Sequence, residues 1–142
     1  MDNASSVDTV GARLAQQFFA FAGMGLVGTL AHYSALLALV EWVGLASVTG
    51  SAIGFVLGAL VNYLLNYKFT FRSSAAHSKA LPKFLTVAAV GFGLNSLFML
   101  AGTLWLPVHY LVVQMLATGT VLFWGFSANL LWTFKRKVHS HE

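Results

Sequence analysis

The sequence lacks cysteine and contains very little charge. Only 8% of its 142 residues are charged, whereas soluble domains contain about 25%. Without cysteine, the chain can form neither a disulfide framework nor a thiolate metal site. With 58% hydrophobic residues, it also has too little polar surface to cover a globule in water. The composition therefore predicts an integral membrane protein.

The sequence also lacks the common catalytic motifs. It contains no phosphate-binding loop, no serine nucleophile elbow and no zinc-binding HExxH motif. Its four acidic residues lie near the termini or in one connection, which disfavours a paired-carboxylate or two-metal site. We expect no enzyme activity, catalytic residue, metal site or cofactor. Nucleic acid is not an expected partner either, because the basic residues coincide with the edges of the apolar stretches.

Four apolar stretches are each long enough for the roughly 20 residues that cross a hydrocarbon core about 30 Å thick. They cover residues 18–40, 47–67, 84–106 and 111–134. Asp2 and Asp8, rather than a basic segment, precede the first stretch, so we do not expect a signal peptide. We predict an all-α membrane protein. Its parts are a cytoplasmic segment at 1–17 that includes a short interfacial helix, a four-helix transmembrane domain at 18–134, and a cytoplasmic tail at 135–142.

The eight Lys and Arg residues give the predicted orientation. One precedes the first span, four lie between the second and third spans, and three follow the fourth. The other two connections, at 41–46 and 107–110, contain none. Because cytoplasmic loops are enriched in Lys and Arg, we expect a multi-pass protein of the cytoplasmic membrane, in contact with its lipids and with both termini in the cytoplasm.

The two halves of the chain resemble each other. A shift of 63 positions lays NYKFTFR at 66–72 over NLLWTFK at 129–135, and the same shift pairs His32 with Asn95. Because each half holds two spans, we predict two repeats of parallel topology, related by a pseudo-twofold axis along the membrane normal. The repeats cover about 18–72 and 81–135.

The second span carries Gly50, Gly54, Gly58, Asn62 and Asn66 at every fourth position. Residues four apart are neighbours on one side of a helix. Glycine lets another backbone approach closely, and helices in lipid associate through such packing. The stripe therefore predicts a helix contact.

His32, Asn95 and Gln114 lie inside predicted spans, where an unpaired polar group costs several kcal/mol. They must face protein or a water-filled cavity. For Asn95 and Gln114 two interpretations are open, interhelical hydrogen bonding or the lining of a polar path. His32 is either a packed neutral ring or a proton-linked switch.

Basic and amide side chains meet at the predicted cytoplasmic ends of the spans. Asn66 and Asn129 lie shortly before basic residues, at a depth where an amide can reach a lipid headgroup. The basic residues at the span ends are orientation signals in one interpretation, and in the other they converge on one phosphate; they are Lys68, Arg72, Lys83, Lys135 and Arg136.

The spacing of Phe21, Gly25, Thr29, Leu30 and Tyr33, together with the repeated N-x-x-[FW]-T-F-[KR] ends, resembles the GtrA-like family over residues 18–137. The resemblance implies a small protein of cell-surface polysaccharide assembly. Such a protein moves polyprenyl-phosphate-linked sugars across the cytoplasmic membrane or assists membrane glycosyltransferases. The motif match assigns phosphate and headgroup binding to Asn62, Asn66, Lys68, Arg72, Asn129 and Lys135. The fourth span departs from the second in having Gly125 where the second has Asn62.

Two hypotheses follow for the function. In the first, the protein flips a polyprenyl-phosphate sugar lipid across the cytoplasmic membrane, and His32, Asn95 and Gln114 line the path. In the alternative, it is a scaffold that anchors or recruits a membrane glycosyltransferase. Four helices leave little room for a sugar phosphate, so we expect a homodimer, with Gly23, Gly25 and Gly28 as a second surface of small residues.

Overall fold

The computed structural model describes residues 3–70 and 77–134, which are almost entirely helical. The elements are α1 (Asn3–Leu37), a π-helical turn η1 (Ala38–Trp42), α2 (Ser47–Thr70), α3 (His77–Trp105) and α4 (Tyr110–Phe134). Four stretches are long and apolar enough to cross a membrane, namely Ala22–Trp42, Ser47–Phe69, Leu81–Trp105 and Tyr110–Ala128. The prediction of an all-helical chain with four spans is confirmed.

Local sequence signals end the helices at one side of the bundle. In η1 the amide of Val43 donates to the carbonyl of Ala38 over 3.2 Å, which is the i→i+5 spacing of a π-helix. Gly44 then takes a positive φ of 79°, a conformation that suits glycine at the end of a helix. Proline cannot continue a helix easily, and Pro107 follows the last residue of α3 by two positions.

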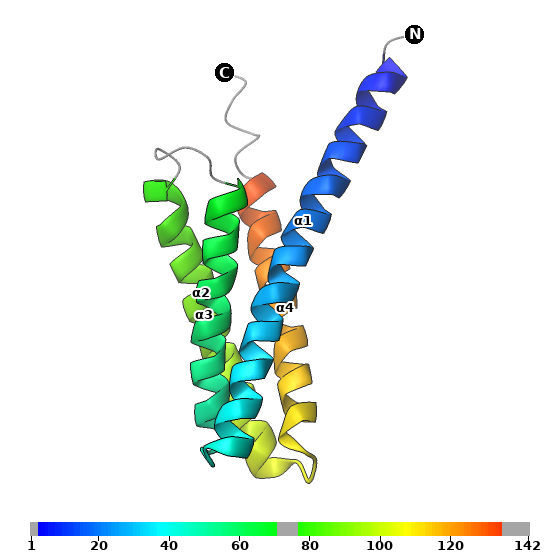
Figure 1. Ribbon diagram of the computed structural model, residues 1–142. Helices are drawn as coiled ribbons and strands as arrows, with labels where there is room; N and C mark the ends of the chain where they lie inside the picture. The colour runs from blue at the N-terminus through cyan, green and yellow to red at the C-terminus, as the bar shows by residue number, and fades with distance from the viewer. Residues whose placement is uncertain (1–2, 71–76, 135–142) are drawn as a thin grey trace.

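The helices run alternately up and down, so both short connections lie at one end of the bundle and the N-terminus lies at the other (Figure 1). Helix α1 makes its closest packing with α2, α2 also packs on α3, and α3 packs on α4. The backbones of α1 and α4 approach each other much less closely. We call the contact between these two helices the α1–α4 seam.

Helix α1 is longer than predicted. Residues 3–17 are helical, but they continue into the first span as one helix of 35 residues and do not form a separate interfacial helix. All described side chains between positions 9 and 23 are exposed. Figure 1 shows this part of α1 leaning away from the other three helices.

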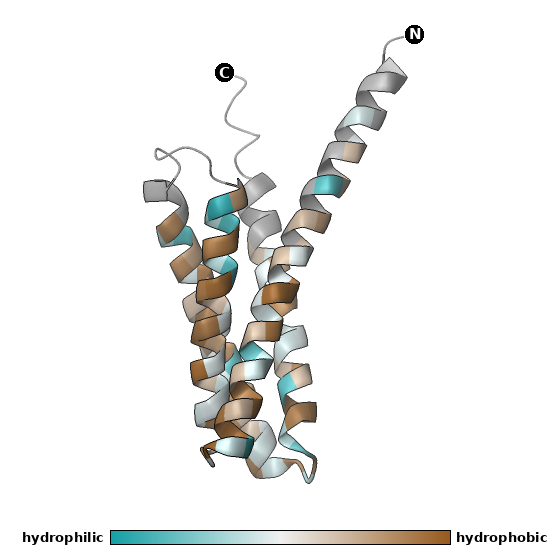
Figure 2. Cartoon of the chain, viewed as in Figure 1, coloured by the Kyte–Doolittle hydropathy of each residue, from teal (hydrophilic) through white to brown (hydrophobic). Residues whose placement is uncertain are grey.

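The distribution of polarity is the reverse of that in a soluble protein. Large apolar side chains cover the outside, and Leu60 and Phe123, for example, are 53% and 73% exposed. Figure 2 shows apolar residues along much of the described part of each helix. Of the six largest fully buried side chains, three are polar. Since lipid rather than water faces the surface, polar groups gain by turning inward.

Candidate functional site

The glycines of α2 bring α1 close to the centre of the bundle. A methyl group added to Gly54 would lie 2.7 Å from the carbonyl oxygen of His32, and one added to Gly58 would lie 2.5 Å from the carbonyl oxygen of Gly28. Gly50 meets the side chains of Leu36 in α1 and Val40 in η1. The predicted helix contact is therefore confirmed, and the stripe is occupied within one copy of the chain.

Three polar side chains from three helices form a closed ring of hydrogen bonds beside this contact. Asn95 Nδ2 on α3 donates to Ser51 Oγ on α2 over 2.8 Å, and Ser51 Oγ donates to Gln114 Oε1 on α4 over 2.5 Å. Gln114 Nε2 then donates to Asn95 Oδ1 over 2.9 Å. All three residues are at most 1% exposed. Each therefore finds hydrogen-bond partners without water, as a polar group in hydrocarbon requires.

The ring is linked to α1 through α4. Gln114 Nε2 also lies 3.3 Å from Thr118 Oγ1, and the hydroxyl groups of Thr118 and Tyr33 are 2.8 Å apart. His32 lies beside this link on α1, with its ring against that of Tyr33. The polar cluster thus joins all four helices. It comprises Tyr33, Ser51, Asn95, Gln114 and Thr118, with His32 at its edge.

His32 is packed on one side and unsatisfied on the other. Its ring makes edge contacts with Tyr33 and Phe55, at centroid distances of 5.6 and 5.9 Å. The Nε2 atom is buried and has no hydrogen-bond partner among the described residues. The ring therefore occupies a packed position, while the proton-linked role stays a prediction.

Sequence reasoning missed Ser51, which is at the centre of the cluster. The four buried polar residues are His32, Ser51, Asn95 and Gln114. They form two pairs at the repeat offset, because Asn95 follows His32 by 63 positions and Gln114 follows Ser51 by the same number. Applying the offset to Gln114 would have identified Ser51.

At the basic end of the bundle, the structure brings together two of the predicted headgroup ligands. Asn66 Nδ2 donates to the backbone oxygen of Asn62 over 2.8 Å and to its side-chain oxygen over 2.9 Å. Asn62 in turn packs against Gly28 on α1. Lys68 is exposed and lies about 200° around α2 from Asn66, so it is not part of this pair. Arg72, Lys135 and the side chain of Asn129 lie outside the described residues.

Side chains rather than close backbone packing bridge the α1–α4 seam. The hydrogen bond between Tyr33 and Thr118 crosses it in the middle of the membrane-spanning region. Near the two short connections, Tyr110 Oη at the start of α4 donates to Glu41 Oε1 in η1 over 2.5 Å. Separating α1 from α4 would therefore break two described side-chain hydrogen bonds.

The comparison with known families places this arrangement. The family model of the GtrA/DPMS transmembrane domain matches residues 20–134. The chain belongs to this family. No curated protein and no solved structure matches the chain.

Membership in the GtrA/DPMS family confirms the resemblance found in the sequence. It associates the chain with the biosynthesis of glycans or polysaccharides from lipid-linked sugars. It also agrees with the four apolar helices in making this a multi-pass membrane protein, and proteins of the family are in general non-catalytic.

Proposed function

We propose that this GtrA/DPMS protein translocates a polyprenyl-phosphate-linked sugar across the cytoplasmic membrane. The observation that carries the proposal is the polar cluster, which reaches from the centre of the bundle to Tyr33 and Thr118 at the α1–α4 seam. A sugar cannot enter hydrocarbon without hydrogen-bond partners, and the cluster presents the part-buried hydroxyl groups of Tyr33 and Thr118 at the seam, with the paired amides of Asn95 and Gln114 behind them. The polyprenyl chain stays in lipid outside the seam. Asn95 and Gln114, with His32 beside them, would line the path.

The shape of the seam supports this route. Toward the basic end, α1 leans away from the bundle and its described side chains are exposed up to position 23. Toward the other end, the bonds of Tyr33 to Thr118 and of Tyr110 to Glu41 close the seam. Such an arrangement is open to a headgroup at one membrane surface and closed at the other.

We further propose that the open end faces the cytoplasm and receives the phosphate. All Lys and Arg residues precede the first span, lie between the second and third spans or follow the fourth. These are the parts of the chain that the excess of Lys and Arg in cytoplasmic loops assigns to the cytoplasm. Lys68, Arg72 and Lys135 would hold the phosphate, with amides from Asn62, Asn66 and Asn129 beside them. An anionic lipid that leaves the negative interior gains about 2.3 kcal/mol per charge per 100 mV, so the proposal needs no ATP site.

The two halves are proposed to be repeats of parallel topology with both termini in the cytoplasm. Buried positions recur at the offset of 63, as for Leu36 and Met99 and for Gly54 and Ala117. The contact of Gly28 with Gly58 recurs as the contact of Gly91 with Val121. These correspondences support the proposal that the two halves are repeats.

A scaffold that recruits a membrane glycosyltransferase is the second candidate. It is favoured by the closed ring of Ser51, Asn95 and Gln114, whose hydrogen bonds are satisfied within the chain. A rigid bundle with an apolar surface is suited to binding another membrane protein. This candidate predicts that a glycosyltransferase co-purifies with the chain and leaves the membrane when the chain is absent.

A homodimer would supply a second wall for the path. The glycines of α2 are occupied within one chain, but no neighbouring atom of the described residues lies within 4 Å of a methyl group added to Gly23 or Gly25 of α1. They leave a small-residue surface for a second copy. Mass measurement in nanodiscs tests this, and a monomer that still translocates would contradict it.

The decisive experiment measures movement of a labelled polyprenyl-phosphate sugar across liposomes that contain the purified protein. We expect faster movement than in empty liposomes, and slower movement with Arg72→Ala or Lys135→Ala. Lys79→Ala is the matched control, because it removes a charge at the same end outside the proposed phosphate ligands. Parent protein that gives no acceleration in any lipid composition would exclude translocation. Normal movement with both variants would leave Arg72 and Lys135 as orientation signals.

A further inference from the structure

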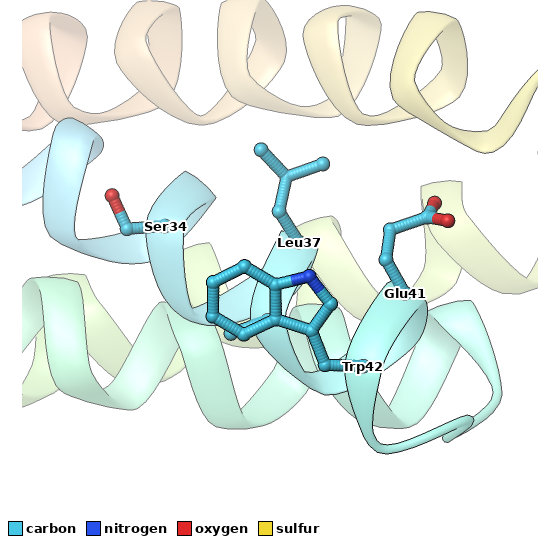
Figure 3. A pocket seen from close by; sticks show the side chains of 5 residues that line it. Ser34, Leu37, Glu41 and Trp42 are labelled. Atoms are coloured by element: carbon cyan, nitrogen blue, oxygen red, sulfur yellow. The ribbon is translucent and has the colours of Figure 1, made fainter.

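A groove opens beside η1, at the end of the bundle that lies away from the basic residues. It is shallow and open, it has a volume of about 620 Å³, and all its lining residues lie on one face of the end of α1 and of η1, namely Ser34, Leu37, Ala38, Glu41 and Trp42. In Figure 3 the indole of Trp42 lies between Ser34 and Glu41, and the side chain of Leu37 points away from the indole. The groove thus combines an aromatic face, a carboxylate and a hydroxyl group.

Glu41 is held in place but retains a free acceptor. Its Oε1 atom accepts the hydrogen bond from Tyr110, and no described residue donates to Oε2. A carboxylate has about four acceptor positions, so most of them stay available to a ligand. No Lys or Arg occurs between positions 14 and 67 or between 84 and 134. The charge of Glu41 is therefore not neutralised by a basic residue of the spanning helices.

Trp42 and its counterpart in the second half, Trp105, differ in the residue that precedes each of them. Trp105 lies one repeat offset after Trp42, and the side chains of Trp42 and Trp105 are 87% and 80% exposed. Both positions suit a Trp that sits at the membrane surface. Trp42, however, follows the acidic Glu41, whereas Trp105 follows Leu104. The first half therefore has a carboxylate beside its Trp that the second half lacks.

We infer that this groove binds the sugar ring of the lipid-linked substrate after it has crossed the membrane, and that it prefers a ring without acidic groups. This inference rests on the proposed function. The C–H face of a sugar packs on the flat indole of Trp42, and neighbouring hydroxyl groups donate to Glu41. The carboxylate repels a uronic acid and the phosphate, since no basic residue of the spanning helices offsets it. The phosphate therefore stays outside the groove.

The test is a binding measurement that does not depend on translocation. The full chain in nanodiscs is titrated with radiolabelled short-chain polyprenyl phosphoglucose and, separately, with the matching phosphoglucuronate. We expect Glu41→Leu and Trp42→Leu each to weaken phosphoglucose binding about tenfold, because the first loses a hydrogen bond to a charged group and the second loses the aromatic face that packs on the sugar. The control Trp105→Leu removes an equally exposed Trp at the same end and should change binding less than twofold. Glu41→Gln should narrow the preference for phosphoglucose over phosphoglucuronate.

The outcomes separate this site from the proposed function. Equal losses of binding with Trp42→Leu and Trp105→Leu would show that both Trp residues only anchor the protein at the membrane surface, which would overturn the site. Binding by all variants as strong as that of the parent would also overturn it. A preference for phosphoglucuronate in the parent would overturn the charge argument. If the parent binds, the groove variants lose binding and liposomes show no translocation, the site stands and translocation fails. A parent that binds neither lipid overturns both. Thermal unfolding of each variant confirms that it is folded.

Discussion

The polar cluster permits a sharp comparison between two serines. Ser51 and Ser96 both carry a buried hydroxyl group in the centre of the bundle, but Ser51 has two hydrogen bonds and Ser96 has none with any described residue. Ser51→Ala removes an acceptor from Asn95 and a donor from Gln114. Ser96→Ala removes a hydroxyl group that is buried and has no hydrogen-bond partner among the described residues. The same chemical change should therefore have opposite effects at the two positions.

The magnitude for Ser51→Ala follows from the two lost bonds. Interhelical hydrogen bonds in membranes are worth about 0.6 kcal/mol on average, which gives a loss of about 1.2 kcal/mol for two. Amide groups left buried without partners would raise this toward about 1–3 kcal/mol each. We favour the lower figure, because the denatured chain in a micelle also finds partners for these groups. Ser96→Ala should leave stability unchanged or raise it.

The assay is reversible unfolding in mixed micelles with increasing sodium dodecyl sulfate, followed by the loss of helical circular dichroism. The parent, Ser51→Ala and Ser96→Ala are compared at the same detergent ratio. The reasoning would be refuted if Ser51→Ala were as stable as the parent, or if Ser96→Ala lost as much stability as Ser51→Ala. Either result would mean that the described hydrogen bonds do not distinguish the two hydroxyl groups.

Two further predictions concern helix packing and orientation. Gly58→Ala puts a methyl group 2.5 Å from a backbone oxygen of α1; overpacking costs about 1–3 kcal/mol against a gain of up to about 1 kcal/mol in helix propensity, so thermal stability should fall. In Gly119→Ala the added methyl group meets open space, so this variant should be more stable than the parent. An equal rise in the thermal stability of Gly58→Ala and Gly119→Ala would contradict the close contact of Gly58 with α1. Because the chain has no cysteine, Ala46→Cys should react with an impermeant maleimide only from outside and Ser140→Cys only from the cytoplasm, whereas the reverse pattern would invert the proposed topology.

The sequence predicted the helices better than the way in which their polar groups meet. Length and hydropathy are enough to locate the spans, and the glycine spacing in α2 is enough to locate its contact with α1. Which polar side chains pair depends on the rotation of each helix about its axis. Hydropathy does not determine that rotation, because lipid tails are as apolar as the side chains and no apolar face is driven toward another helix. Asn95 and Gln114 were therefore found as buried polar residues, but their meeting at Ser51 was not predicted.

The groove at Glu41 shows a second limit. From the sequence alone, the small number of acidic residues disfavours a paired-carboxylate site, and Glu41 falls in the predicted connection at 41–46. In the structure it belongs to a π-helical turn that continues the first span, and it bonds to Tyr110, which is 69 positions away in the chain. Such a turn shifts the register at the end of a helix. The hydrogen bond joins residues far apart in the chain, and single-sequence patterns do not reveal such a pair.

The contacts of α1 also indicate which helix would move in the proposed translocation. The close glycine contacts with α2 are costly to separate, whereas the seam with α4 is bridged by only two described side-chain hydrogen bonds. At about 0.6 kcal/mol each, these two bonds cost about 1.2 kcal/mol to break. One negative charge moving down 100 mV supplies about 2.3 kcal/mol. The free energy from the membrane potential thus exceeds the cost of breaking these two bonds while α1 stays on α2.

This comparison predicts that fixing the seam stops transport. Tyr33→Cys and Thr118→Cys, joined by a dimaleimide, tether α1 to α4; a dimaleimide is used because the tyrosine ring keeps the backbones too far apart for a disulfide. We expect crosslinking to abolish movement of the labelled lipid in liposomes. The control pair, Phe55→Cys and Phe92→Cys, replaces two rings 5.8 Å apart between α2 and α3 and should leave transport intact when crosslinked. Full transport by the fully crosslinked seam variant would show that the sugar takes another route.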